Sequence, residues 1–520
     1  MRQLTGLDAQ FLALESARQY GHVGGLAILD PSTAPGGKLE LEDVQALIVE
    51  RLPLLPPFQW KLAEVPLGLD YPYWVDDEDF DIDFHVRELA IPHPDERKLA
   101  EQVARIMARP LDRARPLWET YLIHGLADGH LGLLTKIHHS VIDGVSGAEI
   151  MGALLDLSPD GREVPSGVRH AISEKPGDLE MLARGALGIP RYPLRVLQGL
   201  PRTLPNIAEV PMFSGLPGAG LVGKAAGMVA QALSPDAVAP GRDVLRAPRT
   251  SFNGRISAHR RFAFGQLPLD EVKAIKNEYG VTLNDLVVSI CAHAVRRWLV
   301  EHDELPADPL VAQIPVSVRA PDEMGTFGNR ILLMSAPLHT EIEDPKERLR
   351  ATHDSLKAMK DTHKALPAQL LQDATQFIPP AVFNRAARLT FTLSTGLARP
   401  TWNLVISNVP GPQFPLYCAG AELKANYPVS VITDGMGLNI TVMSYNGHLD
   451  FGIVADREQM SDVWCLLDWL REGLDVLRPP GMAKAPAGGN GKKASATKKP
   501  ASRAKSGNGG ARAKKASAKR

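Results

Sequence analysis

The sequence predicts a mixed α/β (α+β) fold built as two lobes around mixed sheets. The chain has 520 residues, more than one hydrophobic core usually organises. Helical and strand patterns interleave irregularly along it, which indicates packed layers of helices and mixed sheets. Proline and glycine are frequent between about residues 160 and 250. We therefore expect lobes over 1–160 and 249–480, an inter-lobe crossover over 161–248 and a tail over 481–520.

The first lobe mixes both kinds of element. Apolar residues at helical spacing predict helices over 43–52 and 96–111. Residues 71–89 alternate enough to predict a strand bounded by acidic turns. The short apolar run 131–139 predicts another strand, which ends at a polar turn before helical spacing resumes over 145–157. Strand, polar turn and helix therefore follow one another in this part of the chain.

The second lobe repeats the mixture. A helix is predicted over 269–280 and another over 282–299, with Thr282 or Asn284 as its N-cap. An amphipathic helix over 462–477 closes the lobe. Runs rich in β-branched residues predict strands over 309–318, 330–340, 402–412 and 437–456.

Cysteine usage and apolar runs restrict the class of protein. The three cysteines, Cys291, Cys418 and Cys465, lie far apart, which excludes a cysteine-rich metal site and argues against a disulfide framework. The first residues lack the charged and apolar regions of a secretory signal, and no apolar run reaches membrane-spanning length. We expect a reducing, cytoplasmic compartment and only peripheral contact with membranes.

Charge divides the chain into an acidic body and a basic tail. Residues 481–520 hold 12 Lys or Arg and no Asp or Glu, which leaves 46 basic residues against 59 acidic ones elsewhere. Apart from Met482 at its start, the tail has no large apolar side chain, so we expect it to be disordered. It either contacts anionic lipid or nucleic acid through electrostatics, or serves only as a solubilising appendage. Amphipathic pieces of the crossover at 179–188 and 222–233 either pack against a lobe or rest on a membrane surface.

The sharpest local pattern is His138-His139-Ser140-Val141-Ile142-Asp143-Gly144, at the predicted strand-to-helix turn. A histidine held at such a turn can reach a cleft, accept a proton from a hydroxyl and return it to a leaving group. Asp143 suits a structural role, either capping the helix or pairing with a basic group. Gly144 allows close backbone approach or positive φ. The alternative is that the histidines are ordinary residues of a solvated turn; for His138 the two interpretations remain open, because adjacent side chains at a strand end point apart.

This H-H-x-x-x-D-G pattern resembles the active-site motif of the coenzyme-A-dependent acyltransferase superfamily. Other segments resemble, in order, the bacterial wax ester synthase/diacylglycerol acyltransferase family over about residues 1–475, although Arg255 stands where that family commonly has proline. The residues that carry this likeness are Asp8, Phe11 and Glu15; His22 and Gly24; Pro116, Leu117 and Trp118; Asn284 and Asp285; Ser407, Asn408, Pro410 and Gly411; and the run 427–452.

The resemblance implies a two-lobed sandwich with a tunnel between the lobes. His139 would be the general base that deprotonates the hydroxyl of a diacylglycerol or a long-chain alcohol, which attacks the thioester of acyl-CoA directly. Acyl-CoA is then a co-substrate, and we expect no metal or redox cofactor. The developing oxyanion needs donors, for which Asn284, Asn439 and Ser444 are candidates, with helix capping as the alternative role of Asn284. Trp118 and Pro116 are expected to pack, and the SNVPGP segment to form a tight turn.

Two other functions remain open at this stage. One is an acyltransferase of the same superfamily with a non-lipid acceptor or a donor bound to a carrier protein. The other is a non-catalytic protein that coats lipid inclusions. Intact His139 and Asp143 argue against the second alternative. The resemblance favours an enzyme that is peripheral on the inner membrane face or on lipid droplets.

Overall fold

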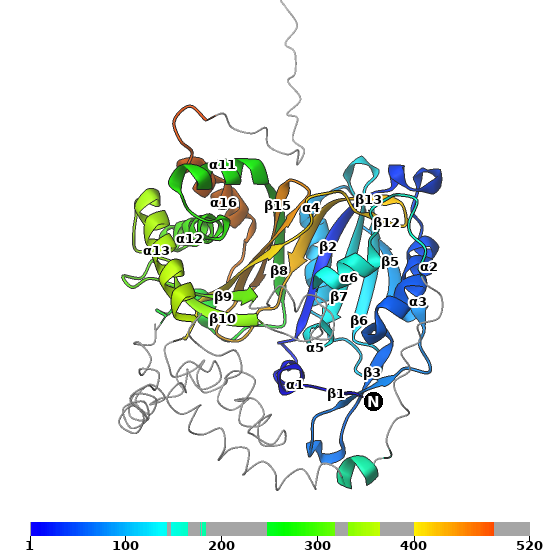
Figure 1. The fold of residues 1–520 in the computed structure, drawn as a ribbon. Coiled ribbons are helices and arrows are strands. Elements are labelled where there is room, and N and C mark those ends of the chain that lie inside the picture. The colour runs from blue at the N-terminus through cyan, green and yellow to red at the C-terminus, as the bar shows by residue number, and fades with distance from the viewer. Residues whose placement is uncertain are drawn as a thin grey trace, which may run out of the picture. The chain divides into compact units, whose positions relative to one another are not determined.

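The computed structural model describes residues 2–142, 147–164, 177, 179–183, 247–317, 331–363 and 400–482 (Figure 1). These residues form the mixed α/β fold that the sequence predicts, with two six-stranded sheets and one three-stranded sheet. The strands are β1 (Arg2–Gln3), β2 (His22–Asp30), β3 (Trp60–Ala63), β4 (Tyr73–Asp76), β5 (Val86–Ala90), β6 (Trp118–His124), β7 (Leu131–His138), β8 (Arg260–Pro268), β9 (Val311–Ser317), β10 (Ile331–Pro337), β11 (Leu404–Pro410), β12 (Tyr417–Cys418), β13 (Ala421–Val429), β14 (Leu438–Tyr445) and β15 (His448–Asp456). The helices are α1 (Gly6–Ala13), α2 (Leu41–Arg51), α3 (Ile82–His85), α4 (Glu96–Met107), α5 (His139–Ile142), α6 (Gly147–Leu154), α11 (Leu269–Tyr279), α12 (Leu283–Glu301), α13 (Pro345–His363) and α16 (Trp464–Val476).

The first six-stranded sheet has the order β12-β13-β2-β7-β6-β5. Its pairings are antiparallel except for the parallel pair β5–β6. The two faces are buried in different clusters, because successive side chains of a strand point to opposite faces. Trp118 packs with Leu47 and Ile48 of α2, whereas Leu134 packs with Leu99 of α4. Helices thus cover both faces of the sheet.

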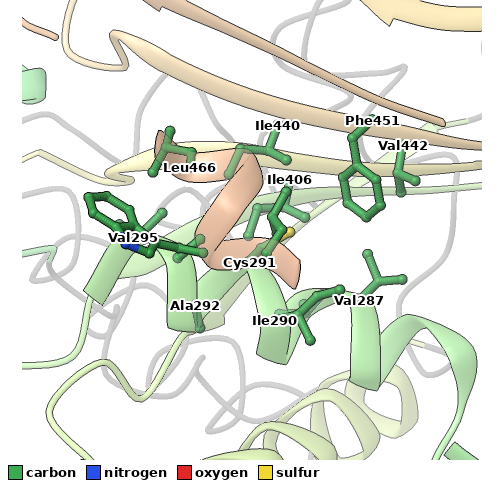
Figure 2. Packing of buried hydrophobic residues seen from close by; sticks show 14 of the residues in the cluster. Val287, Ile290, Cys291, Ala292, Val295, Ile406, Ile440, Val442, Phe451 and Leu466 are labelled. Carbon is green, nitrogen blue, oxygen red and sulfur yellow. The ribbon is translucent and has the colours of Figure 1, made fainter. Parts of the chain in front are cut away.

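The second six-stranded sheet has the order β10-β9-β11-β14-β15-β8, with β11 parallel to β9 and β14. α12 and α16 pack against it (Figure 2). Val287 and Ile290 of α12 share a fully buried cluster with Ile406 of β11 and Ile440 of β14. This cluster is the main core of the C-terminal half, and it leaves the opposite face of the sheet turned toward the first sheet.

β12 and β13 cross from the C-terminal half of the chain to the first sheet. β13 pairs antiparallel with β2, from Glu422 opposite Asp30 to Val429 opposite Gly24. The register shifts between Leu423 and Ala425, as at a β-bulge. The first sheet is therefore completed by residues nearly 400 positions away from β2 in the sequence.

Local signals explain where the helices begin. Asp95 accepts hydrogen bonds from the Arg97 and Lys98 amides at the start of α4. Thr282 and Asp285 form a reciprocal capping box at the start of α12, so the N-cap is Thr282 and the alternative cap, Asn284, is wrong. The other predicted helices and the other strands of the second lobe are confirmed, with boundaries shifted by a few residues, but 437–456 is a hairpin of two strands, β14 and β15, and not one strand.

Two predictions need correction. Residues 71–89 hold β4, the short helix α3 and β5 in place of a single strand, because Asp81 caps a helical turn by accepting from the Asp83 amide. The first four residues of SNVPGP, Ser407–Pro410, lie inside β11 rather than in a tight turn.

Parts of the crossover, and the tail from residue 483 onward, lie outside the described residues. In the crossover, residues 179–183 are helical, and Met181 is buried with Tyr73 and Val75. That contact agrees with packing of this piece against the first lobe, whereas the piece at 222–233 is not described. Within the described chain, no helix is both long enough and apolar enough to span a membrane.

Candidate active site

The double histidine lies where β7 ends and α5 begins. His138 is the last residue of β7 and is paired with His22 of β2. The His138 N–H donates to the carbonyl of Leu117 (2.9 Å), and the His139 N–H donates to the carbonyl of Gly21 (2.7 Å). The predicted strand end is confirmed, and main-chain bonds from both neighbouring strand regions fix the position of the turn.

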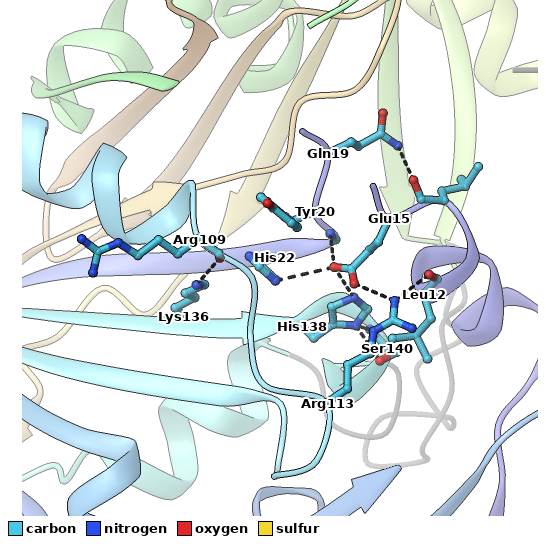
Figure 3. Close-up of polar contacts among 12 residues, drawn as sticks. Leu12, Glu15, Gln19, Tyr20, His22, Arg109, Arg113, Lys136, His138 and Ser140 are labelled. Atoms are coloured by element: carbon cyan, nitrogen blue, oxygen red, sulfur yellow. Dashed lines mark hydrogen bonds and ion pairs between the residues drawn. The ribbon is translucent and has the colours of Figure 1, made fainter. Parts of the chain in front are cut away.

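His138 is buried, and both of its ring nitrogens have partners (Figure 3). Nδ1 accepts from the Ser140 N–H at 3.2 Å and lies 2.7 Å from Ser140 Oγ. Since a main-chain N–H can only donate, the ring proton lies on Nε2, which donates to Glu15 Oε1 at 3.1 Å. This geometry favours the interpretation of His138 as a residue that holds the turn, not one that takes a substrate proton.

Glu15 is the acceptor around which this cluster is built. Its Oε1 also accepts from the Gly21 amide (3.0 Å), and its Oε2 lies 2.8 Å from the Arg113 guanidinium. Burial alone raises the pKa of a carboxyl, but the bonds from His138, Arg113 and Gly21 outweigh it and lower the pKa of Glu15 to about 2. Glu15 therefore carries a full negative charge at neutral pH.

Two further basic side chains, His22 and Lys136, lie near the Glu15 carboxylate. His22 is buried, its Nε2 lies 3.6 Å from Glu15, and burial together with the nearby Lys136 charge holds the pKa of His22 well below its usual value. Lys136 donates to the carbonyls of Ile106 (3.1 Å) and Arg109 (2.6 Å) at the end of α4. Burial lowers the pKa of Lys136 to about 8. These groups tie β2 and β7 to α4 and keep the region around Glu15 ordered.

His139 occupies a different environment. Its ring stacks on Phe11 of α1, with 4.0 Å between ring centroids and 13° between ring planes. Its Nδ1 is buried and has no hydrogen-bond partner among the described residues. Burial, and secondarily the adjacent His138, lowers the pKa of His139 to about 4. The ring is therefore an unprotonated base at neutral pH, as proton abstraction from a hydroxyl requires.

The other residues assigned from the sequence are not gathered around His139 by any contact in the described chain. Asp143 and Gly144 lie outside the described residues. Asn284 lies in the first turn of α12, and its Oδ1 accepts from Asn408 Nδ2 of β11 at 3.5 Å. Asn284 therefore connects a helix to the sheet beneath it.

Asn439 and Ser444 are both buried on β14 but lie on opposite faces of the strand, because they are an odd number of residues apart. Asn439 donates to the Val431 carbonyl at 2.9 Å and accepts from Thr441 Oγ1 at 2.8 Å. Ser444 Oγ accepts from the Gly411 amide at 3.1 Å. These hydrogen bonds hold β14 to its neighbouring segments.

Sequence reasoning assigned no role to the residues that surround the histidines. Phe11, Glu15 and His22 entered only through the family likeness, and Arg113 and Gly21 were missed. All except Arg113 lie in or near the N-terminal segment, more than 110 residues before the histidines. The one signal in the sequence is the concentration of family-like residues between Asp8 and Gly24, which no local pattern explains.

A pocket opens at the seam between the two halves of the fold. It lies on the His22 side of the cluster, and His139 does not line it. Its lining comes from the segment before β2, the end of α4, the start of β8 and the β13–β14 connection: Tyr20, His22, Met107, Arg260, Val429, Ser430, Val431, Ile432 and Val454. Within the described ranges, no three His, Cys, Asp or Glu side chains are grouped so that they could hold a metal ion.

Comparisons with known proteins agree over most of the chain. The model of the wax ester synthase/diacylglycerol acyltransferase catalytic domain matches residues 4–287, and that of the family's C-terminal domain matches residues 327–478. A Mycobacterium tuberculosis protein whose name provisionally assigns it diacylglycerol O-acyltransferase activity is 37% identical over 480 residues, 92% of this chain and 90% of its own. The O-acyltransferase WSD of Acinetobacter baylyi is 33% identical over 92% of this chain and 97% of its own. The solved wax ester synthase/diacylglycerol acyltransferase of Marinobacter aquaeolei superposes with a TM-score of 0.63 at 31% identity, covering 92% of this chain and 98% of its own.

Proposed function

Because the chain belongs to the wax ester synthase/diacylglycerol acyltransferase family and is an acyltransferase, we propose that His139 is its general base in acyl transfer from acyl-CoA to a lipid hydroxyl. The acceptor is a diacylglycerol, giving triacylglycerol, or a long-chain alcohol, giving a wax ester. The observation that supports this most directly is the state of His139: its ring is unprotonated, stacked on Phe11 and buried at Nδ1, so Nε2 is the nitrogen that we propose takes the proton.

The reaction balances with one imidazole. His139 Nε2 takes the proton of the acceptor hydroxyl as its oxygen bonds to the thioester carbonyl carbon. The carbon–sulfur bond then breaks, and the imidazolium returns the proton to the coenzyme A thiolate. Attack is direct, without an acyl-enzyme, and the chemistry requires neither metal nor redox cofactor. Acyl-CoA is a co-substrate.

The low pKa of His139 has two consequences for this step. With a pKa of about 4, nearly all of the rings are unprotonated at pH 7. Such a ring is also a weak base, so proton transfer from a hydroxyl must be assisted by stabilising the charge that develops. The imidazolium is formed beside the developing oxyanion, and the attraction between the two charges favours the transition state over the free enzyme.

Donors to that oxyanion are proposed to come from Asn284, Asn439 or Ser444, with Gly144 allowing close approach of the substrate. Asn284 is the best supported of the three, because among the described residues its side-chain contact, with Asn408, uses its oxygen and not its amide nitrogen. Asn439 and Ser444 already hold neighbouring segments through 2.9 and 3.1 Å bonds. Asp143 is proposed to support the histidine turn.

We also propose that the enzyme acts at a lipid surface, on the cytoplasmic membrane face or on lipid droplets, since its acceptors and products are insoluble in water. The basic tail 481–520 would contact anionic lipid headgroups there. Deleting the residues after Pro480 should leave activity in solution unchanged and weaken sedimentation with vesicles that contain phosphatidylserine. If the truncated chain bound these vesicles as well as the full chain, the proposed role of the tail would be contradicted. If truncation weakened binding to purely zwitterionic vesicles by the same amount, the tail would not act through electrostatic attraction.

The function is tested by measuring coenzyme A release from palmitoyl-CoA by the purified full chain. Dioleoylglycerol and hexadecanol serve as the two acceptors, and wild type is compared with His139→Ala. The matched control is His93→Ala, since His93 is an exposed histidine of the same lobe. Acceptor-dependent release that disappears only in His139→Ala is expected, and the faster acceptor names the preferred hydroxyl. No release with either acceptor would contradict the lipid assignment, and full activity of His139→Ala would contradict the role of this residue.

A further inference from the structure

The partner that usually orients a catalytic histidine is absent from His139 in the described chain. In hydrolytic triads a carboxylate bonds Nδ1 and fixes the ring plane and the tautomer. The carboxylate of the described site, Glu15, bonds His138 and Arg113 instead. Nδ1 of His139 is buried without a hydrogen-bond partner. Another contact must therefore keep the ring from rotating about χ2.

Phe11 makes that contact. The two rings lie nearly parallel, at 13°, with their centroids 4.0 Å apart. At this separation the Phe11 ring covers one face of the imidazole, so rotation of His139 about χ2 would drive its edge into the aromatic face. A stacked ring occupies the face of the imidazole and not its edge, where Nε2 lies.

The surroundings of Phe11 indicate that stacking is its principal contact. α1 is anchored by other side chains, Ala9, Leu12 and Ala13, which are buried. Phe11 is only half-buried and belongs to none of the hydrophobic clusters of the described residues. α1 itself lies against α5 (Figure 1). The helix therefore presents Phe11 to His139 without using it to fill a core.

We propose that Phe11 is a positioning residue for acyl transfer, which holds the His139 ring by face-to-face stacking in place of a hydrogen bond to Nδ1. This inference rests on the proposed role of His139. The second support of the same residue is the main-chain bond to Gly21, so side chain and main chain of His139 are both held by residues 11–21. The N-terminal segment is thus a part of the active site.

Two variants of Phe11 separate stacking from packing. Phe11→Leu keeps apolar volume but removes the flat face, whereas Phe11→Tyr keeps the face. We expect Phe11→Leu to lower kcat about 10- to 100-fold, the range for a misplaced catalytic group, with KM for both substrates changed less than about twofold. Phe11→Tyr should retain at least about half of the wild-type kcat. A loss that is equal in both variants would contradict the proposal.

The pH profile supplies a readout that a merely structural role would leave unchanged. Burial is the largest cause of the low pKa of His139, and removal of Phe11 admits water to the ring. The acid limb of kcat/KM should therefore move to higher pH in Phe11→Leu and stay in place in Phe11→Tyr. An unshifted limb together with wild-type kcat in Phe11→Leu would overturn the proposal.

The matched control is Phe58→Leu. Phe58 is a buried phenylalanine of the same lobe that stacks on Trp118 with 4.8 Å between ring centroids, and within the described chain its ring does not stack on His138 or His139. This variant should lower the melting temperature more than Phe11→Leu does, without shifting the pH profile. His139→Ala is measured alongside: its full activity would refute the proposed function, whereas its inactivity with a fully active Phe11→Leu would refute only the role of Phe11.

Discussion

Glu15 and His138 are 123 residues apart in the sequence, and Glu15 Oε1 accepts a hydrogen bond from His138 Nε2 at 3.1 Å. The contact joins the segment that follows α1 to the end of β7. Glu15 is also bonded to Arg113, so three distant parts of the first lobe meet at one carboxylate. The charge of Glu15 is therefore a structural element of the histidine turn.

Replacing Glu15 by Gln should destabilise the fold in a pH-dependent way. The pKa of Glu15 is lowered from 4.5 to about 2, so its charge stabilises the folded state above pH 4.5 and this stability is lost as the pH falls toward 2. We expect Glu15→Gln to lower the free energy of unfolding by about 3 kcal/mol at pH 7, and by less at pH 3.5. Urea titrations at both pH values measure the difference.

Glu64→Gln is the control for this prediction, because Glu64 also pairs with Arg113 but has a side chain that is 67% exposed. It should change the free energy of unfolding by less than about 0.5 kcal/mol. Equal effects of the two variants would show that the Glu15 charge contributes nothing beyond an ordinary surface pair.

Asp450 should make the protein less stable as the pH rises toward 8. This fully buried carboxyl of β15 accepts from the Asn426 amide (2.7 Å) and from Gln266 (2.8 Å), and burial raises its pKa from 3.8 to about 7. A raised pKa contributes stability that is complete below pH 3.8 and is lost as the pH passes through 7. Between pH 4 and pH 8 the loss is about 4 kcal/mol.

The Asp450→Asn variant should lack this pH-dependent component, since an amide does not ionise. The free energies of unfolding of wild type and variant are measured by urea denaturation from pH 5 to pH 8. Over this range the free energy of unfolding should fall less steeply with pH in the variant than in wild type. Asp270→Asn, at a side chain that is 94% exposed, should follow wild type. Parallel curves for wild type and Asp450→Asn would mean that Asp450 keeps its charge throughout this range.

A methyl group at Gly24 should disturb the pairing of β2 with β7. A Cβ on Gly24 would lie 2.3 Å from the carbonyl oxygen of Thr135, a main-chain atom of the paired strand. Gly24→Ala should therefore lower the free energy of unfolding by about 3 kcal/mol, measured by urea denaturation.

Gly152→Ala is the matched control, because no atom lies within 4 Å of a Cβ at this position of α6. Alanine is the better helix former, so this variant should be neutral or more stable by up to about 1 kcal/mol. Comparable losses for Gly24→Ala and Gly152→Ala would indicate that the strands separate enough to admit the methyl group.

Local patterns predicted the elements of the fold but not all of their partners. The spacing of apolar residues located α4, α12 and α16, because a helix of this length must bury one continuous stripe. The prediction of a single strand over residues 71–89 was wrong, because Asp81 caps a short helix within a segment whose alternating polar and apolar residues suggest a strand. The pairing of β13 with β2 has no local signal, because register depends on which distant edge is available.

The same limit applies to the site. The turn that carries His138 and His139 was predicted from the strand pattern and the motif, and its place at the end of β7 is confirmed. The bonds from Glu15 to His138 and to Arg113 depend on how α1 and the segment after it fold back onto the sheet. No sequence pattern predicts that this N-terminal segment packs against the end of β7, so the partners of the histidines became evident only in three dimensions.

β13 is synthesised about 400 residues after its partner strand β2, which affects folding during synthesis. Until residues 421–429 leave the ribosome, β2 has β7 on one side and an open row of main-chain donors and acceptors on the other. An unpaired strand edge readily recruits a strand from another chain. Nascent or truncated chains that stop before β13 should therefore be prone to aggregate, and the first lobe cannot be produced as a well-behaved fragment without the strand that the second half contributes.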